Sequence, residues 1–427
     1  MNAKKTTVFA KTRNDDLSHL NEAQKQAVKH AEGPLLIIAG AGTGKTAVIT
    51  ERISWLVRER GFKPESILAL TFTEKAANEM EERLDFLLPM GFSRVQIKTF
   101  HGFCEQTLRE FAIEIGLDSA FKILTGPQQW LLLRKHLFEL PLKYFRPLGN
   151  PTKFLQAIIR AIGAAKDQDL QPENFLAYSE QLKEKSQKTT NEEEQKALIE
   201  ESEKWHEFAL VYREYNRILI AESAMDFGDV ILNTLKLLKE RPSILRKLRE
   251  RLSEVLVDEF QDTNGAQVEL LRLLVPDSNG AITVVGDDDQ SIYAWRGSNL
   301  TNILYFQEWY PNAKKIVLTE NYRSPQGLLD SAYALIQNNN PLRLEKTANV
   351  DKKLKSKVND ETENVIFHYH FPTVERESTF IAEKIISLAD QKGFSYRDVA
   401  ILARTNSQID NIIPSLVQYD IPYHVAE

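Results

Sequence analysis

Residues 35–46, LLIIAGAGTGKT, decide the fold of this chain. Four apolar residues give way at Ala39 to small residues and glycines, and Lys45 and Thr46 then open an amphipathic segment. This order predicts a buried strand, a tight loop and a helix. Backbone N–H groups in such a loop surround a polyphosphate, the helix N-terminus adds the positive end of its dipole, and the lysine and hydroxyl side chains meet phosphate and Mg²⁺. The stretch therefore predicts a site for a nucleoside triphosphate with magnesium.

The loop departs at one position from the phosphate-binding pattern G-x-x-x-x-G-K-[ST], because Ala39 stands where the pattern has glycine. Alanine has the smallest side chain that could replace that glycine, and Gly40, Gly42 and Gly44 remain to line the phosphates. The alternative is a glycine-rich turn that binds nothing. A Gly-Lys-Thr sequence at a helix start, directly after a buried strand, favours phosphate binding.

The composition indicates a globular protein of several domains. A length of 427 residues and a hydrophobic content of 42% allow sizeable cores, at ~100–200 residues per domain. The formal charge of −6 argues against a uniformly basic nucleic-acid-binding protein but allows a local groove. No apolar run reaches the ~18 residues of a membrane-spanning helix, and the N-terminal residues lack a signal-peptide pattern, so we expect a cytoplasmic protein with no membrane partner. The single cysteine, Cys104, predicts a buried thiol.

Strands and helices alternate after the glycine-rich loop. Residues 46–60 have the apolar period of a helix, residues 66–73 predict a second strand, residues 74–88 a helix and residues 95–101 a third strand. This alternation predicts an α/β fold with a parallel sheet, which binds ligands at the carboxyl ends of its strands. Three candidate residues fall at those ends: Phe72, Thr99 and His101.

The pattern then becomes helical from about residue 103 to residue 221, with no clear strand. It predicts a helical insertion at 106–220 that interrupts a first α/β domain made of residues 1–105 and 221–315. The strongly charged run at 183–204 predicts a solvated helix or a mobile loop.

A short apolar strand predicted at 254–257 ends in two adjacent carboxylates, Asp258 and Glu259. An aspartate at a strand end can hold Mg²⁺, and the next carboxylate can orient and deprotonate an attacking water. Acidic pairs at strand ends also occur on solvated loops. The phosphate-binding loop upstream favours the catalytic interpretation.

Residues 283–298, TVVGDDDQSIYAWRGS, predict another strand followed by an acidic turn. The carboxamide of Gln290 could hydrogen-bond a γ-phosphate or the attacking water. Tyr293 and Trp295 offer flat faces on which nucleobases could stack, and Arg296 could bind a phosphate. On these residues alone, the alternative that both aromatic side chains belong to the core is favoured.

Residues 316–325, IVLTENYRSP, place Tyr322 and Arg323 at a strand end, where a ring could stack on adenine and a cation could meet the γ-phosphate. The rest of the chain predicts the first half of a second α/β domain over 316–427. Its expected strands are 365–370, 398–404 and 421–425, and its expected helices are 375–391 and 406–417.

The order and spacing of these stretches resemble those of the superfamily 1 DNA helicases of the UvrD/Rep/PcrA type. LNEAQKQAV is similar to the Q motif, GAGTGKT to motif I, LTFTEKAANEM to motif Ia and TFHGF to the next DNA-contact motif. VDEFQDT resembles motif II, GDDDQSIYAWRGS motif III and ENYRSP motif IV, and MDFGDV resembles a stretch found just before motif II. The resemblance implies RecA-like domains with ATP between them.

The resemblance also implies a role for each candidate residue. Those implied to bind ATP are Gln24, Gly40, Gly42, Gly44, Lys45, Thr46, Tyr322 and Arg323, with Thr46 and Asp258 on Mg²⁺. Those implied to act in hydrolysis are Glu259 on the water, with Lys45, Gln290 and Arg323. Those implied to contact single-stranded DNA are Phe72, Thr99, His101, Tyr293, Trp295 and Arg296.

The implied activity is ATP-driven movement in the 3′-to-5′ direction on single-stranded DNA, in repair or replication. The implied partners are single-stranded DNA, single-strand/double-strand junctions and accessory repair or replication proteins. Motifs V and VI of the family have no match after Arg323, so we expect an amino-terminal part of a helicase that binds Mg·ATP, hydrolyses it slowly and does not unwind DNA. The alternatives are a nucleotide-binding module without motor activity and the helicase part of a recombination helicase-nuclease.

Overall fold

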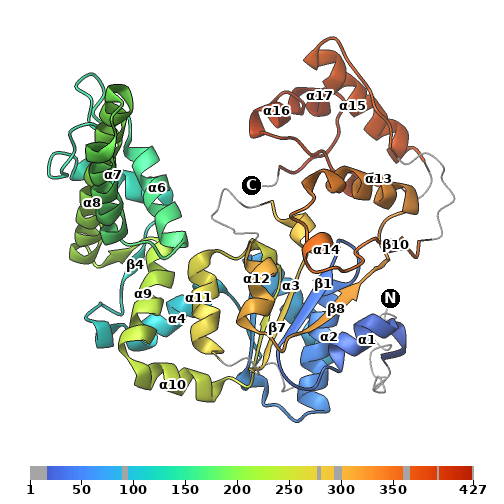
Figure 1. Cartoon of the computed structure of the whole chain (residues 1–427). Helices are drawn as coiled ribbons and strands as arrows, with labels where there is room; N and C mark the ends of the chain where they lie inside the picture. The colour runs from blue at the N-terminus through green and yellow to red at the C-terminus, as the bar shows by residue number, and fades with distance from the viewer. Residues whose placement is uncertain are drawn as a thin grey trace, which may run out of the picture. The chain divides into compact units, whose positions relative to one another are not determined.

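A six-stranded parallel sheet forms the centre of the larger of two compact units, Met1–Asp360 and Glu361–Glu427. The computed structural model describes residues 17–88, 95–276, 280–292, 301–358, 366–391 and 394–425. The strands run in the order β3-β2-β6-β7-β1-β8, and Figure 1 labels β7, β1 and β8 of this sheet. Their bounds are β1 Leu35–Ala39, β2 Ile67–Thr71, β3 Gln96–Thr99, β6 Glu254–Val257, β7 Ile282–Gly286 and β8 Lys314–Leu318. The predicted parallel α/β sheet is confirmed.

Helices cover both faces of this sheet, because its central strands are apolar on both sides. Leu36 and Ile38 of β1 belong to one core, and Leu35 and Ile37 belong to the other. The helices that pack on the second core are α1 Glu22–Val28, α2 Lys45–Arg58 and α3 Glu74–Leu87. Those that pack on the first are α4 Phe100–Phe111, α9 Phe227–Glu240, α10 Pro242–Arg251, α11 Gly265–Leu274 and α12 Thr301–Trp309.

The predicted helical insertion has a core of its own, formed mainly by four helices. They are α5 Gly126–Lys135, α6 Leu155–Asp167, α7 Pro172–Lys188 and α8 Glu192–Ala221. The charged run at 183–204 lies almost wholly in α7 and α8, which lie side by side (Figure 1). Among the described residues, no helix is long and apolar enough to cross a membrane.

Two sequence expectations in this region were wrong. The strand predicted at 95–101 ends at Thr99, because the Thr99 side chain accepts the backbone N–H of Gly102 and caps α4. His101 therefore lies on a helix. The insertion also contains a short strand, β4 Lys122–Ile123, which pairs with β5 Ala224–Met225 where the chain returns to the sheet.

Beyond the sheet, a further pair of short strands extends the larger unit. β9 Glu320–Asn321 pairs in parallel with β10 Lys355–Ser356, and α13 Gln326–Ile336 and α14 Leu344–Thr347 lie between them in sequence. The domain boundary expected between residues 315 and 316 falls within β8, which pairs with β1 along its whole length. The division into three domains remains a proposal.

The smaller unit contains α15 Val374–Ala389, α16 Asn406–Asp410 and α17 Ile413–Gln418. Its core consists of Ala382, Ile385, Leu416 and Ile421. The two predicted helices are confirmed, and the second is divided near residue 411. The three strands predicted here do not form within 366–391 and 394–425, because these segments make no strand pairs there.

Candidate nucleotide-binding site

The glycine-rich loop between β1 and α2 makes close approaches that require glycine. Gly42 and Gly44 have φ angles of +73° and +86°, in the left-handed region that other residues adopt at a cost. A Cβ atom on Gly42 would lie 2.7 Å from Nδ2 of Asn321, and one on Gly44 would lie 2.9 Å from Nε2 of Gln24. The loop is therefore enclosed by α1 on one side and by the segment after β8 on the other.

Helix α1 and Tyr322 meet at the end of the site where the sequence predicts adenine. Gln24 is buried, and its Nε2 donates to the carbonyl of Thr43 at 2.9 Å. Asn21 caps α1 by accepting the Gln24 backbone N–H at 2.9 Å, and its Nδ2 donates to the Tyr322 hydroxyl at 3.0 Å. The Tyr322 side chain is half-exposed and also donates to Glu320 at 2.8 Å. The geometry leaves this ring accessible to a flat ligand.

Lys45 connects the phosphate loop to two residues expected to act in hydrolysis. Its Nζ lies 2.7 Å from Oε2 of Glu259 and donates to Oε1 of Gln290 at 3.0 Å. Glu259 has a φ angle of +48°, a strained conformation of the kind that clusters at functional sites. The structure therefore brings together three side chains that are far apart in the sequence.

The Asp258 end of the site offers oxygen atoms of the kind that Mg²⁺ binds. Asp258 is buried after β6 and Thr46 lies in the first turn of α2, and carboxylate and hydroxyl oxygens are ligands that Mg²⁺ accepts. Burial, followed by the neighbouring charge of Glu259, raises the pKa of Asp258 to about 6. A bound cation would stabilise the ionised form of this carboxylate.

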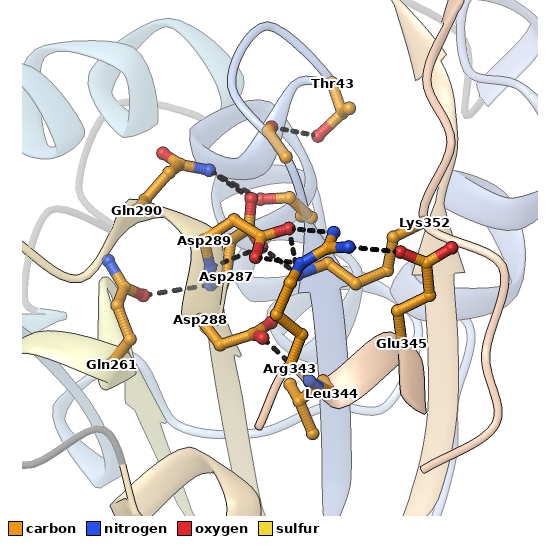
Figure 2. Close-up of polar contacts among 12 residues, drawn as sticks. Thr43, Gln261, Asp287, Asp288, Asp289, Gln290, Arg343, Leu344, Glu345 and Lys352 are labelled. Carbon is orange, nitrogen blue, oxygen red and sulfur yellow. Dashed lines mark hydrogen bonds and ion pairs between the residues drawn. The ribbon is translucent and has the colours of Figure 1, made fainter. Parts of the chain in front are cut away.

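A second group of carboxylates, at residues 287–289, is already matched by cations. Its ligand atoms lie within 4.8 Å of one another. The ammonium of Lys352 lies among them, and the guanidinium of Arg343 contacts Asp289 (Figure 2). These contacts favour Asp258 over the 287–289 group as the magnesium ligand.

Arg323 lies beside the phosphate loop. Asn321 holds this segment in place, because its Nδ2 donates to the Ala41 carbonyl at 2.6 Å and its Oδ1 accepts the Arg323 backbone N–H at 2.9 Å. The Tyr322 N–H also donates to the Gly42 carbonyl at 2.9 Å. The Arg323 side chain is exposed, so the γ-phosphate contact remains a prediction.

Three of the predicted DNA contacts lie at or just beyond the carboxyl ends of β2 and β3. Phe72 is half-buried between β2 and α3. Thr99 is buried and donates to Glu74 at 2.8 Å. The ring of His101 packs edge-on against Phe227 with centroids 5.7 Å apart, and burial lowers the pKa of His101.

The other three, Tyr293, Trp295 and Arg296, lie outside the described residues. The role of all six in binding DNA therefore remains a prediction.

Several residues of the site escaped the sequence analysis. Asn21 and Asn321 adjoin predicted motif residues, and the Asn21-x-x-Gln24 spacing is a capping-box signal that could have indicated the first. Gln261 donates to Glu259 at 2.9 Å, and Asp287 accepts from Gln290 at 2.7 Å. No local signal marks Lys352, because it lies in no recognised motif.

Comparison with known proteins assigns the family. The profile of the UvrD/REP helicase N-terminal domain matches residues 20–311, and that of the UvrD-like helicase C-terminal domain matches residues 316–427. The ATP-dependent DNA helicase PcrA of Leuconostoc citreum is 37% identical over 410 residues, which cover 95% of this chain and 50% of the relative. The PcrA protein of Bacillus subtilis strain 168 is 36% identical over 419 residues, which cover 97% of this chain and 51% of the relative.

This chain thus spans about half the length of the curated relatives it matches. The N-terminal profile alone covers well over half of the chain, including the phosphate loop and the Asp258–Glu259 pair. The chain belongs to the UvrD/REP helicase family.

Proposed function

We propose that this chain binds Mg·ATP at the β1–α2 loop and forms part of an ATP-dependent DNA helicase that moves 3′-to-5′ on single-stranded DNA, in repair or replication. The contacts of Lys45 carry the proposal. The Lys45 ammonium, on the phosphate loop, contacts both the expected base, Glu259, and Gln290. The same cation would therefore bind the nucleotide and adjoin the residues that act in hydrolysis. The relatives are named ATP-dependent DNA helicases, which supports ATP and DNA as the substrates.

In the proposed reaction the polyphosphate draws Lys45 away from Glu259. The freed carboxylate orients the attacking water and accepts its proton. Thr46 and Asp258 would hold Mg²⁺, which neutralises charge on the phosphates. Gln24 meets the adenine edge, the Tyr322 ring stacks on the base, and Arg323 contacts the γ-phosphate. The positions of these side chains around the phosphate loop support the proposed roles.

Single-stranded DNA is proposed to cross the carboxyl ends of the strands. Phe72 and Thr99 lie at that edge of the sheet, with His101 in the first turn of α4. Tyr293 and Trp295 are proposed to stack on bases, and Arg296 to bind a phosphate. Junction DNA and accessory proteins of repair or replication are the proposed further partners.

The proposed turnover of this 427-residue chain is slow, without unwinding. Phosphoryl transfer gains ~10³–10⁵ in rate from a well-placed arginine in related enzymes. Arg323 lies beside the phosphate loop, but the sequence has no match to the motif VI arginine.

ATP turnover by the full 427-residue chain, with and without single-stranded DNA, tests the proposal. A nucleotide titration and the Lys45→Ala variant accompany it. We expect ATP binding that Lys45→Ala removes, slow hydrolysis and little stimulation by DNA. Strong unwinding by these 427 residues would contradict the proposed weakness, and a wild-type chain that binds no ATP would contradict the nucleotide site itself.

A further inference from the structure

The acidic turn after β7 is held by one buried lysine. The ammonium of Lys352 lies 2.5 Å from Oδ1 of Asp287 and 2.8 Å from Oδ2 of Asp289, and it also contacts Asp288 (Figure 2). A lysine ammonium has three donors, so each carboxylate has one. The Lys352 side chain is 5% exposed, and its ammonium is the cation shared by all three carboxylates.

Two residues near Lys352 in sequence also hold the acidic turn in place. Nε and a terminal nitrogen of Arg343 donate to the two oxygens of Asp289 at 2.7 and 2.6 Å, a bidentate geometry that fixes the carboxylate plane. The backbone N–H of Leu344 donates to Oδ2 of Asp288 at 2.8 Å. We call residues 343–357 the strap.

The same strap reaches the rest of the nucleotide site. The backbone N–H of Lys357 donates to the Asn321 carbonyl at 2.7 Å, directly before Tyr322 and Arg323 in sequence. Leu354 packs on the phosphate loop, where a Cβ atom on Gly40 would lie 3.0 Å from its Cδ1. The strap thus contacts the acidic turn, the phosphate loop and the segment before Tyr322.

Asp287 contacts both Lys352 and Gln290 and so links the two side chains. One oxygen of Asp287 meets the ammonium, and the other accepts Nε2 of Gln290 at 2.7 Å. The second hydrogen of Nε2 is directed to the Ala39 carbonyl at 3.4 Å, which leaves Oε1 for Lys45 at 3.0 Å. Because a carboxylate only accepts and an ammonium only donates, the Gln290 carboxamide has one orientation here.

We propose that Lys352 is a positioning residue that acts through Asp287 on Gln290, so that the Gln290 amide oxygen accepts a hydrogen bond from the attacking water once ATP has taken Lys45. The proposal rests on the proposed nucleotide function and assigns the direction of the Gln290 hydrogen bond. With both N–H groups of the carboxamide directed to Asp287 and the Ala39 carbonyl, its oxygen is the group presented to the reaction.

Single-turnover ATP hydrolysis and ATP affinity, measured on the full chain, test this role. Lys352→Met removes the charge at similar length. We expect it to slow hydrolysis about tenfold or more, since small misplacement of a reacting group is costly, and to leave the dissociation constant for ATP within about twofold. Lys353→Met is the matched control, because Lys353 is the next residue, is half-exposed and lies 3.4 Å from Asp330.

A double-mutant comparison separates positioning through Gln290 from a general structural role. In a Gln290→Ala background we expect Lys352→Met to slow hydrolysis no further. If Lys352→Met does not fold, as judged by thermal unfolding, then Lys352→Gln, which keeps hydrogen-bonding capacity, replaces it in the same comparison. We expect Lys352→Arg to recover part of the rate.

Two results would overturn the inference: a wild-type rate in the neutral Lys352 variant, or an equal slowing with and without Gln290. A wild-type chain that binds ATP but does not hydrolyse it would contradict the proposed function instead. That result is visible before any variant is compared.

Discussion

The ammonium of Lys45 lies 2.7 Å from the carboxylate of Glu259, so the expected phosphate ligand and the expected base neutralise each other. The Lys45 side chain is 11% exposed and that of Glu259 is 35% exposed. The carboxylate is therefore partly exposed beside the phosphate loop, where a polyphosphate would compete for the lysine. Nucleotide binding would exchange one ion pair for another and free the carboxylate only when phosphate is present.

Glu259→Gln should separate binding from hydrolysis. The substitution removes the competing negative charge, so ATP affinity should stay the same or rise, while turnover should fall by ~10²–10⁴-fold, the contribution of a general base. Lys45→Ala is the comparison and should lose most ATP binding. A nucleotide titration and a phosphate-release assay measure the two effects. If Glu259→Gln lost ATP binding and Lys45→Ala kept it, the proposed roles of these two residues would be wrong.

Gly42→Ala should weaken ATP binding by displacing the segment that carries Arg323. The added Cβ would lie 2.7 Å from Nδ2 of Asn321 and 2.8 Å from Cβ of Arg323. Gly33→Ala is the matched control, because Gly33 has a φ angle of +81° with no atom within 4 Å of the added Cβ.

In both variants alanine must adopt a left-handed backbone conformation, which should lower the free energy of unfolding by ~1–2 kcal/mol. Only Gly42→Ala should lose ATP affinity. Equal ATP affinities in the two variants would show that the close approach is unimportant.

The sheet and the phosphate loop could be predicted because their signals are local. A run of apolar residues, a glycine-rich turn and Lys45 stand together in one stretch, and the neighbouring strands repeat the apolar pattern. The end of β3 could not be placed, because the capping bond of Thr99 competes with strand continuation at a single residue. Lys352 could not be found either, since its partners at 287–289 are more than sixty residues away in sequence and only the folded chain unites them.

Arg52→Met should destabilise the larger unit by ~3–5 kcal/mol, the cost of leaving a buried charge unpaired. Arg52 is fully buried and donates to Glu254 at 3.0 Å and to Thr283 at 3.0 Å. It also donates to the carbonyls of Ala27 and Val28 at 3.2 and 3.3 Å, which ties the end of α1 to the sheet.

Urea unfolding measures the effect of this substitution. Arg213→Met is the control, because Arg213 pairs with Glu173 at 3.1 Å on an exposed surface and should cost ~0–1 kcal/mol. A loss for Arg52→Met no larger than that of the control would rule out a structural role for the buried guanidinium.

Asp258→Asn should stabilise the nucleotide-free chain at pH 7.5 more than at pH 5. Burial raises the pKa of Asp258 to about 6 from an ordinary value of 3.8. Between these values the folded chain holds a proton that the unfolded chain has released, so the contribution of Asp258 to the free energy of unfolding falls as the pH rises through this window. Above pH 6 the buried carboxylate is ionised, at a cost on the order of 3 kcal/mol.

Asparagine removes that cost and keeps an oxygen for the Glu259 backbone N–H, which lies 3.0 Å from Oδ1 of Asp258. Urea unfolding at the two pH values measures the gain, with Asp85→Asn on the exposed face of α3 as the control. The same substitution should abolish Mg²⁺-dependent ATP hydrolysis, because an amide is a poorer magnesium ligand than a carboxylate. A stability gain that is equal at both pH values would mean that ionising Asp258 carries no burial cost. If the variant still hydrolysed ATP, Asp258 would not be a magnesium ligand.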